Sequence, residues 1–264
     1  MNFINTYYKN NNARIYQCDN LELLKQLPDN YIDLIYCDIL YNTGRKFKDF
    51  MDNLGTTQEA IEWYKPRLEH IKRVLKDIGS IYLHCDWRLA HYLKVEMDKI
   101  FGENNFINEI IWKYKSGGAS KKKLSNKHDN IYLYSKYKNK YTYNLLKEKS
   151  YNRGFKPYNF KGIEEFKDDI GWYTLINAQD VWEIDMVGRT SKERVNYDTQ
   201  KPKKLLERII NTSSNKNDIV ADFFMGSGTT GETAIQLGRK FIGCDINEKA
   251  CEITKERITK IISV

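Results

Sequence analysis

The fold is decided by the stretch Val220-Ala221-Asp222-Phe223-Phe224-Met225-Gly226-Ser227-Gly228-Thr229-Thr230-Gly231. Its apolar start predicts a buried strand, its glycines predict a tight turn, and the residues from Thr229 onward predict a helix. A second short strand, Lys240–Cys244, ends at Asp245. A unit of this kind binds the adenosine end of a cofactor. Because only residues 232–264 follow the turn, the other strands must come earlier in the chain, in a permuted order.

Two cofactor classes fit the G-x-G-x-x-G spacing of Gly226, Gly228 and Gly231. A dinucleotide would place its pyrophosphate at the turn, where the neighbouring Asp222 carboxylate would repel it. S-adenosylmethionine carries no phosphate, and its amine and sulfonium are cationic, so an acid suits it. Asp222 therefore favours the methyl donor over a nicotinamide cofactor. A plain turn capped by Thr229, without any ligand, is the remaining interpretation.

Composition indicates an ordinary globular protein. With 264 residues and 41% hydrophobic content, the chain can bury one large core with a small lobe attached. No apolar run approaches the ~18 residues of a membrane span. The N-terminus lacks the layout of a signal peptide, so a cytoplasmic location is expected. The five cysteines show no C-x-x-C spacing, so we expect neither disulfides nor a metal site.

The positive charge of the chain is concentrated in one segment. The formal net charge is +8, and residues 113–153 hold twelve Lys or Arg side chains against two acids, with seven tyrosines among them. Cations meet phosphates and aromatic faces stack on bases, so this composition favours a nucleic-acid surface over a merely solvated lysine-rich face. The glycine-containing loop Ser116–Lys123 lies within this segment.

The rest of the chain predicts an α/β sandwich with a mostly parallel sheet. Further strands are expected at residues 14–18, 31–37, 80–84, 108–114 and 130–135, and helices at 21–27, 57–76, 88–100 and 203–210. No helix separates strands 108–114 and 130–135, which predicts an antiparallel hairpin joined by the basic loop. Residues 145–185 are polar, aromatic and without a regular pattern, so we expect an irregular inserted lobe there.

A second motif follows the apolar run at residues 31–37. It reads Asp38-Ile39-Leu40-Tyr41-Asn42-Thr43-Gly44. The exocyclic amine of adenine or cytosine is a poor nucleophile because its lone pair is delocalised into the ring. A carboxylate and a backbone carbonyl that accept its hydrogens free the lone pair, and an aromatic ring holds the extruded base. A strand end with ordinary turn chemistry is the alternative interpretation.

Together with the glycine-rich stretch and Tyr197-Asp198-Thr199-Gln200-Lys201-Pro202, this motif resembles the permuted (β-group) DNA amino-methyltransferases, the N6-adenine/N4-cytosine family. The resemblance implies a Rossmann-like sheet of seven strands in circularly permuted order. It also implies a catalytic half at residues 1–144, a target-recognition lobe at 145–185 and a cofactor-binding half at 186–264.

The resemblance further implies roles for individual residues. Asp38 and the Ile39 carbonyl would accept the hydrogens of the target amine, and Tyr41 would stack on the flipped base. S-adenosylmethionine would be bound by Asp19, Asp38, Thr199, Lys201, Asp222, Phe223, Phe224, Gly226, Ser227, Gly228, Thr229 and Asp245. Double-stranded DNA would be contacted by Lys115, Lys121, Lys122, Lys123 and Lys127.

The chain departs from the family where Ile39-Leu40 replace two prolines, which would have fixed the backbone. The carboxylate, one carbonyl and the ring all remain, so activity is expected. The Asp at position 38, where a Ser also occurs in the family, favours adenine over N4-cytosine by resemblance. A catalytically inactive DNA-binding relative is the alternative from another class. The resemblance also leaves room for a homodimer and a cognate restriction endonuclease. We expect His84 to be an ordinary buried histidine.

Overall fold

The computed structural model describes residues 4–115 and 120–262. Within these residues one large sheet has the strand order β1-β2-β14-β13-β3-β6-β8-β7-β12. Its strands are β1 (Thr6–Lys9), β2 (Ala13–Gln17), β3 (Ile32–Asp38), β6 (Leu75–Cys85), β7 (Phe106–Lys113), β8 (His128–Ser135), β12 (Val181–Glu183), β13 (Ile219–Asp222) and β14 (Lys240–Asp245). The predicted seven strands form the inner part of this sheet, and the short strands β1 and β12 extend its two edges.

The pairing confirms a mostly parallel sheet with the predicted antiparallel hairpin, and β1 and β2 form a second antiparallel pair at one edge. Strands β2, β14, β13, β3 and β6 run parallel to one another, and β7 and β8 pair antiparallel. The late strand β13 lies between β14 and the early strand β3. The sequence order is therefore permuted relative to the spatial order, as the position of the glycine-rich stretch predicts.

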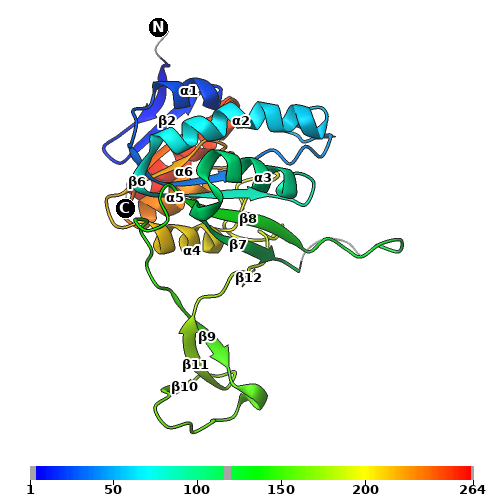
Figure 1. Cartoon of the computed structure of the whole chain (residues 1–264), viewed down its shortest axis with the longest axis vertical. Coiled ribbons are helices and arrows are strands. Elements are labelled where there is room, and N and C mark those ends of the chain that lie inside the picture. The colour runs from blue at the N-terminus through cyan, green and yellow to red at the C-terminus, as the bar shows by residue number, and fades with distance from the viewer. Residues whose placement is uncertain (1–3, 116–119, 263–264) are drawn as a thin grey trace.

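Helices cover both faces of the sheet and define two cores (Figure 1). On one face α1 (Asn20–Gln26), α2 (Thr57–Val74) and α3 (Ala90–Phe101) bury apolar side chains such as Leu24, Leu68 and Leu93. On the other face α4 (Lys203–Ser213), α5 (Thr229–Gln236) and α6 (Glu248–Ile262) do the same with Leu206, Ala234 and Ile258. The molecule is thus a three-layer α/β sandwich.

Local sequence accounts for where these helices begin and end. Asp19 caps α1 by accepting a hydrogen bond from the Leu21 amide. A capping box of Thr56 and Glu59 starts α2, which continues through Pro66 without ending there. The helix that follows the glycine turn begins directly after Gly228, which has φ 72°.

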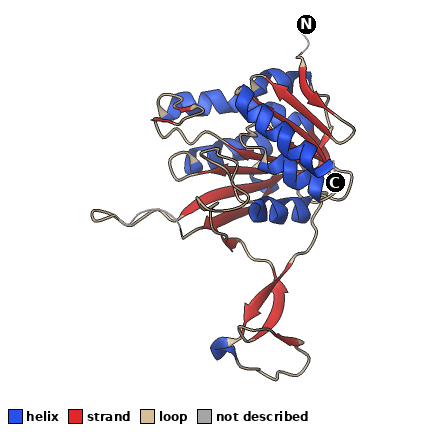
Figure 2. Cartoon of the chain, turned by 180° about the vertical axis from the view of Figure 1, so that it is seen from behind, coloured by secondary structure: helices blue, strands red, loops and turns tan. Residues whose placement is uncertain are grey.

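The segment 145–185 is more regular than expected. It contains a separate antiparallel sheet of order β10-β11-β9, built from β9 (Lys147–Tyr151), β10 (Glu165–Lys167) and β11 (Trp172–Asn177). The prediction of an irregular segment is wrong on this point, because these strands are short and half-exposed and so lack an apolar signal. The small sheet projects away from the body, to which two loop segments connect it (Figure 2).

The remaining elements are short: β4 (Arg45–Lys46) and β5 (Met51–Asp52), which pair antiparallel, and the 3-10 turns η1 (Glu103–Asn105) and η2 (Arg153–Phe155). In the part of the chain that the structure describes, no helix has both the length and the apolar character needed to span a bilayer. The same residues include no cluster of three His, Cys, Asp or Glu side chains suited to a metal ion.

Candidate active site

Four acids lie along one edge of the sheet. The adjacent parallel strands β14, β13 and β3 end at Asp245, Asp222 and Asp38. Asp19 follows the end of the next strand, β2, by two residues. Carboxyl ends of parallel strands are where α/β proteins bind their ligands. The topology therefore brings together the two sequence motifs that are farthest apart in the chain.

Asp38 is the centre of this edge. Its Oδ1 accepts a hydrogen bond of 2.7 Å from the Tyr41 hydroxyl, and its Oδ2 is paired with the ammonium of Lys201. The Lys201 ammonium also lies 5.4 Å from the centroid of the Tyr41 ring. The structure thus joins the Asp38–Gly44 motif to the Tyr197–Pro202 motif directly. Thr199, two residues before Lys201, is half-buried in the same segment.

Hydrogen bonds fix the backbone at Ile39-Leu40, where the family usually has prolines. The Ile39 amide donates to the His84 carbonyl over 3.3 Å, a bond that proline could not make. The Leu40 carbonyl accepts from the Tyr64 hydroxyl over 2.8 Å. Two hydrogen bonds from neighbouring elements therefore hold the backbone next to the Asp38 carboxylate.

The glycine turn lies against β14 and α6. A Cβ atom at Gly228 would stand 2.3 Å from Thr254 Oγ1, so a larger residue does not fit there. The Gly226 amide donates to Asp245 Oδ2 over 3.0 Å, which ties the turn to the end of β14. The other oxygen of Asp245 accepts from the Asn247 amide, and burial raises the pKa of this carboxyl group.

Asp222 is almost completely buried beneath the turn. Its carboxylate accepts hydrogen bonds from the Thr230 hydroxyl (2.5 Å) and the Phe224 amide (3.0 Å). Burial raises the pKa of Asp222 to about 7, although these two hydrogen bonds oppose the shift. The group is therefore poised between its two protonation states near neutral pH.

The other predicted cofactor residues of the turn mostly face inward. Ser227 and Thr229 are buried, and the guanidinium of Arg257 on α6 donates to the Ser227 carbonyl (2.8 Å) and the Thr229 hydroxyl (3.2 Å). Phe223 lies in the core. Phe224 is half-buried, with its ring 6.3 Å from the rings of both Trp63 and Tyr64. The buried residues Ser227 and Thr229 therefore help to hold the backbone of the turn in its conformation.

Asp19 is held by a residue that the sequence did not single out. Arg67 on α2 pairs with Asp19 Oδ2 over 2.8 Å and donates to Asn20 Oδ1 over 2.6 Å. Its guanidinium carbon lies 3.3 Å from the centroid of the Trp63 ring. The sequence pattern around Arg67 predicts a helix and identifies its apolar face. It does not mark Arg67 as a partner of Asp19.

The predicted DNA-contacting lysines lie on and beside the β7–β8 hairpin. Lys115, Lys121, Lys122 and Lys123 are exposed, and Lys127 is half-buried. The Lys115 amide donates to Asp185 Oδ1 over 3.1 Å, so the base of the hairpin contacts the segment after β12. Residues 116–119 of the predicted loop lie outside the described residues.

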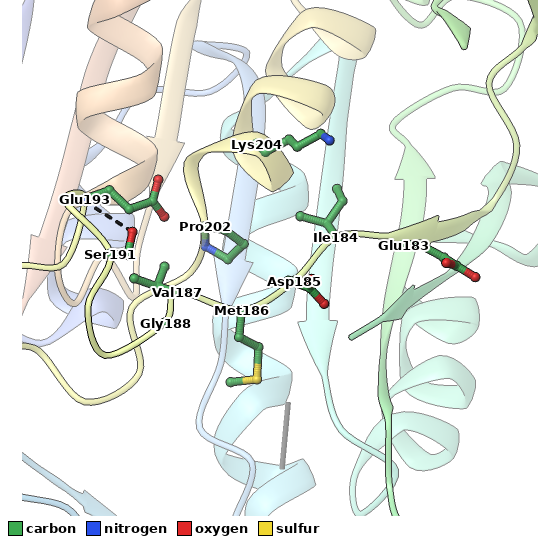
Figure 3. A pocket seen from close by; sticks show the side chains of 10 residues that line it. All are labelled: Glu183, Ile184, Asp185, Met186, Val187, Gly188, Ser191, Glu193, Pro202 and Lys204. Atoms are coloured by element: carbon green, nitrogen blue, oxygen red, sulfur yellow. Dashed lines mark hydrogen bonds between the residues drawn. The ribbon is translucent and has the colours of Figure 1, made fainter. Parts of the chain in front are cut away.

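A separate cavity of about 380 Å³ lies beside the start of α4 (Figure 3). Its lining includes the carboxylates of Glu183, Asp185 and Glu193 together with Pro202 and Lys204. Asp38 and the glycine turn are not among the lining residues. The chemistry described above therefore belongs to the edge of the sheet and not to this cavity.

A Rossmann-like sheet with a glycine turn, acidic strand ends and an Asp-x-x-Tyr motif at one edge defines a methyltransferase that uses S-adenosylmethionine. Residues 32–256 match the family described as DNA methylase. The chain belongs to this family, the N6-adenine/N4-cytosine DNA amino-methyltransferases, and it is an S-adenosylmethionine-dependent DNA methyltransferase.

Two relatives and one solved structure illustrate the match. The type II methyltransferase M.HpaI of Haemophilus parainfluenzae is 34% identical over 91% of this chain and 73% of its own length. The DNA adenine methyltransferase YhdJ of Escherichia coli (strain K12) is 31% identical over 96% of this chain and 85% of its own. The structure of the PvuII DNA methyltransferase (cytosine-N4-specific) superposes with a TM-score of 0.69, covering 98% and 93% of the two chains at 17% identity, which shows the shared fold.

The residues at the edge of the sheet fit this cofactor. Asp222 and Asp245 beside the turn suit a cationic amine and ribose hydroxyls and would repel a pyrophosphate. The Lys201 ammonium suits a carboxylate, and the half-exposed ring of Phe224 offers an apolar face. When bound, the cofactor supplies an activated methyl group on a sulfonium. The chain must then orient the acceptor amine and exclude water.

Proposed function

We propose that the protein transfers a methyl group to the N6 amine of an adenine that is flipped out of a specific duplex sequence. The observation that carries this proposal is the environment of Asp38. One oxygen of its carboxylate is fixed by the Tyr41 hydroxyl, and among the described residues the other is paired with the long, rotatable Lys201 side chain. One oxygen of this carboxylate is held in place, and the partner of the other oxygen can be exchanged. Such a carboxylate is suited to accept a hydrogen bond from an incoming amine.

The steps at Asp38 follow from its charge. The Lys201 ammonium occupies Oδ2 and must leave before an amine can use this oxygen. Lys201 would then be free to pair with the carboxylate of the methionine part of the cofactor. Asp38 Oδ2 and the Ile39 carbonyl would each accept a hydrogen bond from one N–H of the amine, and the Tyr41 ring would stack on the base. This frees the nitrogen lone pair for in-line attack and orients it.

Adenine is favoured over cytosine by two observations. Residue 38 is Asp, which by resemblance is typical of the adenine members of the family. The relative YhdJ, 31% identical over 96% of this chain, is described as a DNA adenine methyltransferase. N4-cytosine is the alternative substrate, and the PvuII enzyme, whose fold this chain shares, acts on that base.

The wider assignment rests on the charged surface and on the relatives. We propose that residues 145–185 and Lys115, Lys121, Lys122, Lys123 and Lys127 contact duplex DNA on either side of the flipped base. Type II methyltransferases among the relatives favour a role in a restriction-modification or orphan methylation system, with a homodimer and a cognate endonuclease as partners. The bacterial sources of these relatives support a cytoplasmic location.

The test is transfer of labelled methyl groups from S-adenosylmethionine to duplex DNA, followed by mass spectrometry of the nucleosides. N6-methyldeoxyadenosine is the expected product, whereas N4-methyldeoxycytidine would move the assignment to the alternative base. Asp38→Ala is expected to lower the single-turnover rate at least ~100-fold, while the calorimetric affinity for the cofactor stays within about threefold. Loss of cofactor binding in this variant would contradict the proposed role of Asp38.

A catalytically inactive DNA-binding relative is the second candidate, because Ile39-Leu40 replace the family prolines. The hydrogen bonds of the Ile39 amide and the Leu40 carbonyl argue against this candidate, since they fix the same backbone. Wild-type protein that binds both cofactor and DNA, yet transfers no methyl group to any base, would establish it.

A further inference from the structure

His84 is a fully buried histidine directly behind the Asp38 carboxylate. It lies near the end of β6, where the register pairs it with Asp38 on β3. Side chains at paired positions of neighbouring strands lie on the same face of a sheet. The ring is therefore built into the sheet beside the active site, and its position does not depend on a loop.

Both ring nitrogens of His84 face polar groups. Nδ1 lies 2.7 Å from the Tyr36 hydroxyl oxygen and 3.7 Å from Asp38 Oδ1. Nε2 lies 3.4 Å from Asp129 Oδ2, in a geometry that falls outside that of a hydrogen bond. The hydrogen-bond contact of Nδ1 is with the Tyr36 hydroxyl, and Asp38 Oδ1 lies next to the ring just beyond hydrogen-bond distance. The ring is therefore fixed by Tyr36 and packs between the two carboxylates.

The surroundings hold the ring tightly. Trp112 meets it edge-on at 5.3 Å between centroids, and the Tyr41 ring lies at 6.0 Å. Asp129 is itself buried and accepts a hydrogen bond from the Tyr114 hydroxyl over 3.1 Å. Although burial alone would raise it, the pKa of Asp129 is lowered by His84, Lys201 and Tyr114. Burying an imidazole between two carboxylates costs free energy of folding, because its polar nitrogens leave water. An apolar ring would fill the same space at less cost.

Asp38 has a particular need for such a support. Its Oδ2 loses the Lys201 ammonium when the target amine arrives, if the proposed function holds. The groups left to fix the carboxylate are then the Tyr41 hydroxyl and His84, both on the Oδ1 side. A rotation of this carboxylate would misplace the acceptor of the amine hydrogen.

We propose that His84 is a positioning residue for methyl transfer: anchored by Tyr36 and Asp129, it holds Oδ1 of Asp38 so that Oδ2 faces the target amine. The inference rests on the proposed function and deepens it. His84 touches no substrate atom and acts through Asp38. The expectation that His84 is an ordinary buried histidine describes its burial and omits its two acidic neighbours.

Three variants test this role. His84→Phe fills the site without polar atoms, and we expect its single-turnover rate of methyl transfer to fall about 100-fold, since a misplacement of 1 Å can cost that much. His84→Asn returns an amide near the position of Nδ1 and is expected to recover about tenfold of that loss. Dissociation constants for S-adenosylmethionine and for duplex DNA should stay within about twofold in both variants.

Tyr82→Phe is the matched control. Tyr82 lies on β6 like His84 and is also buried. The variant loses one hydrogen bond, between the Tyr82 and Ser213 hydroxyls (2.7 Å), which lies away from Asp38. We expect it to keep the wild-type transfer rate. An unchanged rate in His84→Phe, or an equal fall in His84→Phe and Tyr82→Phe, would overturn the inference.

Crystal structures of the wild type and the three variants, each determined with the additional change Lys201→Met so that no ammonium holds Oδ2 of Asp38, separate this inference from the proposed function. Asp38 is expected to keep its side-chain rotamer in the wild type, Tyr82→Phe and His84→Asn, and to leave it in His84→Phe. If the wild type transfers no methyl group, the proposed function fails, and the rotamer decides the positioning role alone. If Asp38 keeps its rotamer in His84→Phe, the positioning role of His84 is contradicted, whatever the methyl-transfer activity.

Discussion

Asp222 is the residue whose environment makes the clearest pH prediction. Its pKa is about 7 in the folded protein against a reference value of 3.8, because the carboxyl group is buried. The folded state therefore binds the proton more tightly than the unfolded state. The free energy of unfolding should fall as pH rises from about 4 to about 7 and then level off. Asp222→Asn should remove up to about 4 kcal/mol of this dependence.

Thermal or urea unfolding at several pH values between 5 and 8 measures this effect. Asp222→Asn should lose little at pH 5 and should be relatively more stable at pH 8, since it need not ionise in the interior. Asp77→Asn, a change at an exposed acid near the start of β6, is the control and should parallel the wild type. Parallel curves for Asp222→Asn and the wild type would contradict the prediction.

At this scale the sequence predicted residues with motif chemistry and missed residues defined by register. Asp38, Tyr41 and Lys201 were singled out from two short motifs, and the structure brings them together. The contact of His84 with Asp129 depends on how β6 and β8 are aligned, and that of Arg67 with Asp19 on how α2 docks. Such partners carry no local signal, because their spacing is set by tertiary structure.

At the scale of elements, residues 44–53 form a strap that leads from the Asp38 motif to the start of α6. The strap contains the β4–β5 pair, and the Phe47 and Phe50 rings stack within it at 4.8 Å. Its far end is held by Asp49, whose carbonyl accepts from the Asn247 side chain (2.5 Å) and whose Oδ1 pairs with Lys249 (2.6 Å).

Loosening this anchor should loosen the strap locally. The Asp49 side chain is only 6% exposed, so Lys249→Met leaves its carboxylate without a charged partner, which costs more than breaking an exposed pair. We expect amide hydrogen exchange in residues 44–53 to quicken about fivefold, and the free energy of global unfolding to fall by the corresponding ~1 kcal/mol.

Lys255→Met is a close control for this prediction. Lys255 lies on the same helix, is 41% exposed against 43% for Lys249, and pairs with the exposed Glu252. Its loss should leave exchange in the strap at the wild-type rate. Equal protection in Lys249→Met and the wild type would show that Asp49 does not anchor the strap.

Helices and strands that bury many apolar side chains were mostly predictable from the sequence. The seven inner strands and helices α1 to α5 have apolar runs or helical spacing, and each was expected near its observed place. Helix α6 also covers the sheet, but it was not among the predicted helices. Strands β9, β10 and β11 are short and half-exposed, so no apolar alternation marks them. Strand β12 joins the sheet only by pairing with β7, a contact between distant segments.

At the scale of the whole molecule, the small sheet should be separable from the body. The ends of the lobe meet: the Ala178 amide donates to the Leu146 carbonyl over 2.9 Å, and Glu148 pairs in register with Ile176. Replacing residues 149–175 by an Asn-Gly turn would close this hairpin, since that dipeptide favours a two-residue connection. The cut keeps Glu148, which is paired with Arg208 of the body over 2.7 Å.

The shortened protein should fold and bind S-adenosylmethionine within about threefold of the wild-type affinity, because every strand end that forms the site lies outside the deletion. Its preference for one duplex sequence over others should be lost, since base readout needs side chains at the grooves and phosphate contacts alone carry no sequence information. Calorimetry with the cofactor and competition binding between cognate and scrambled duplexes measure the two effects. A shortened protein that still prefers the cognate duplex would place recognition in the β7–β8 hairpin, and one that no longer binds the cofactor would show that lobe and body fold as a single unit.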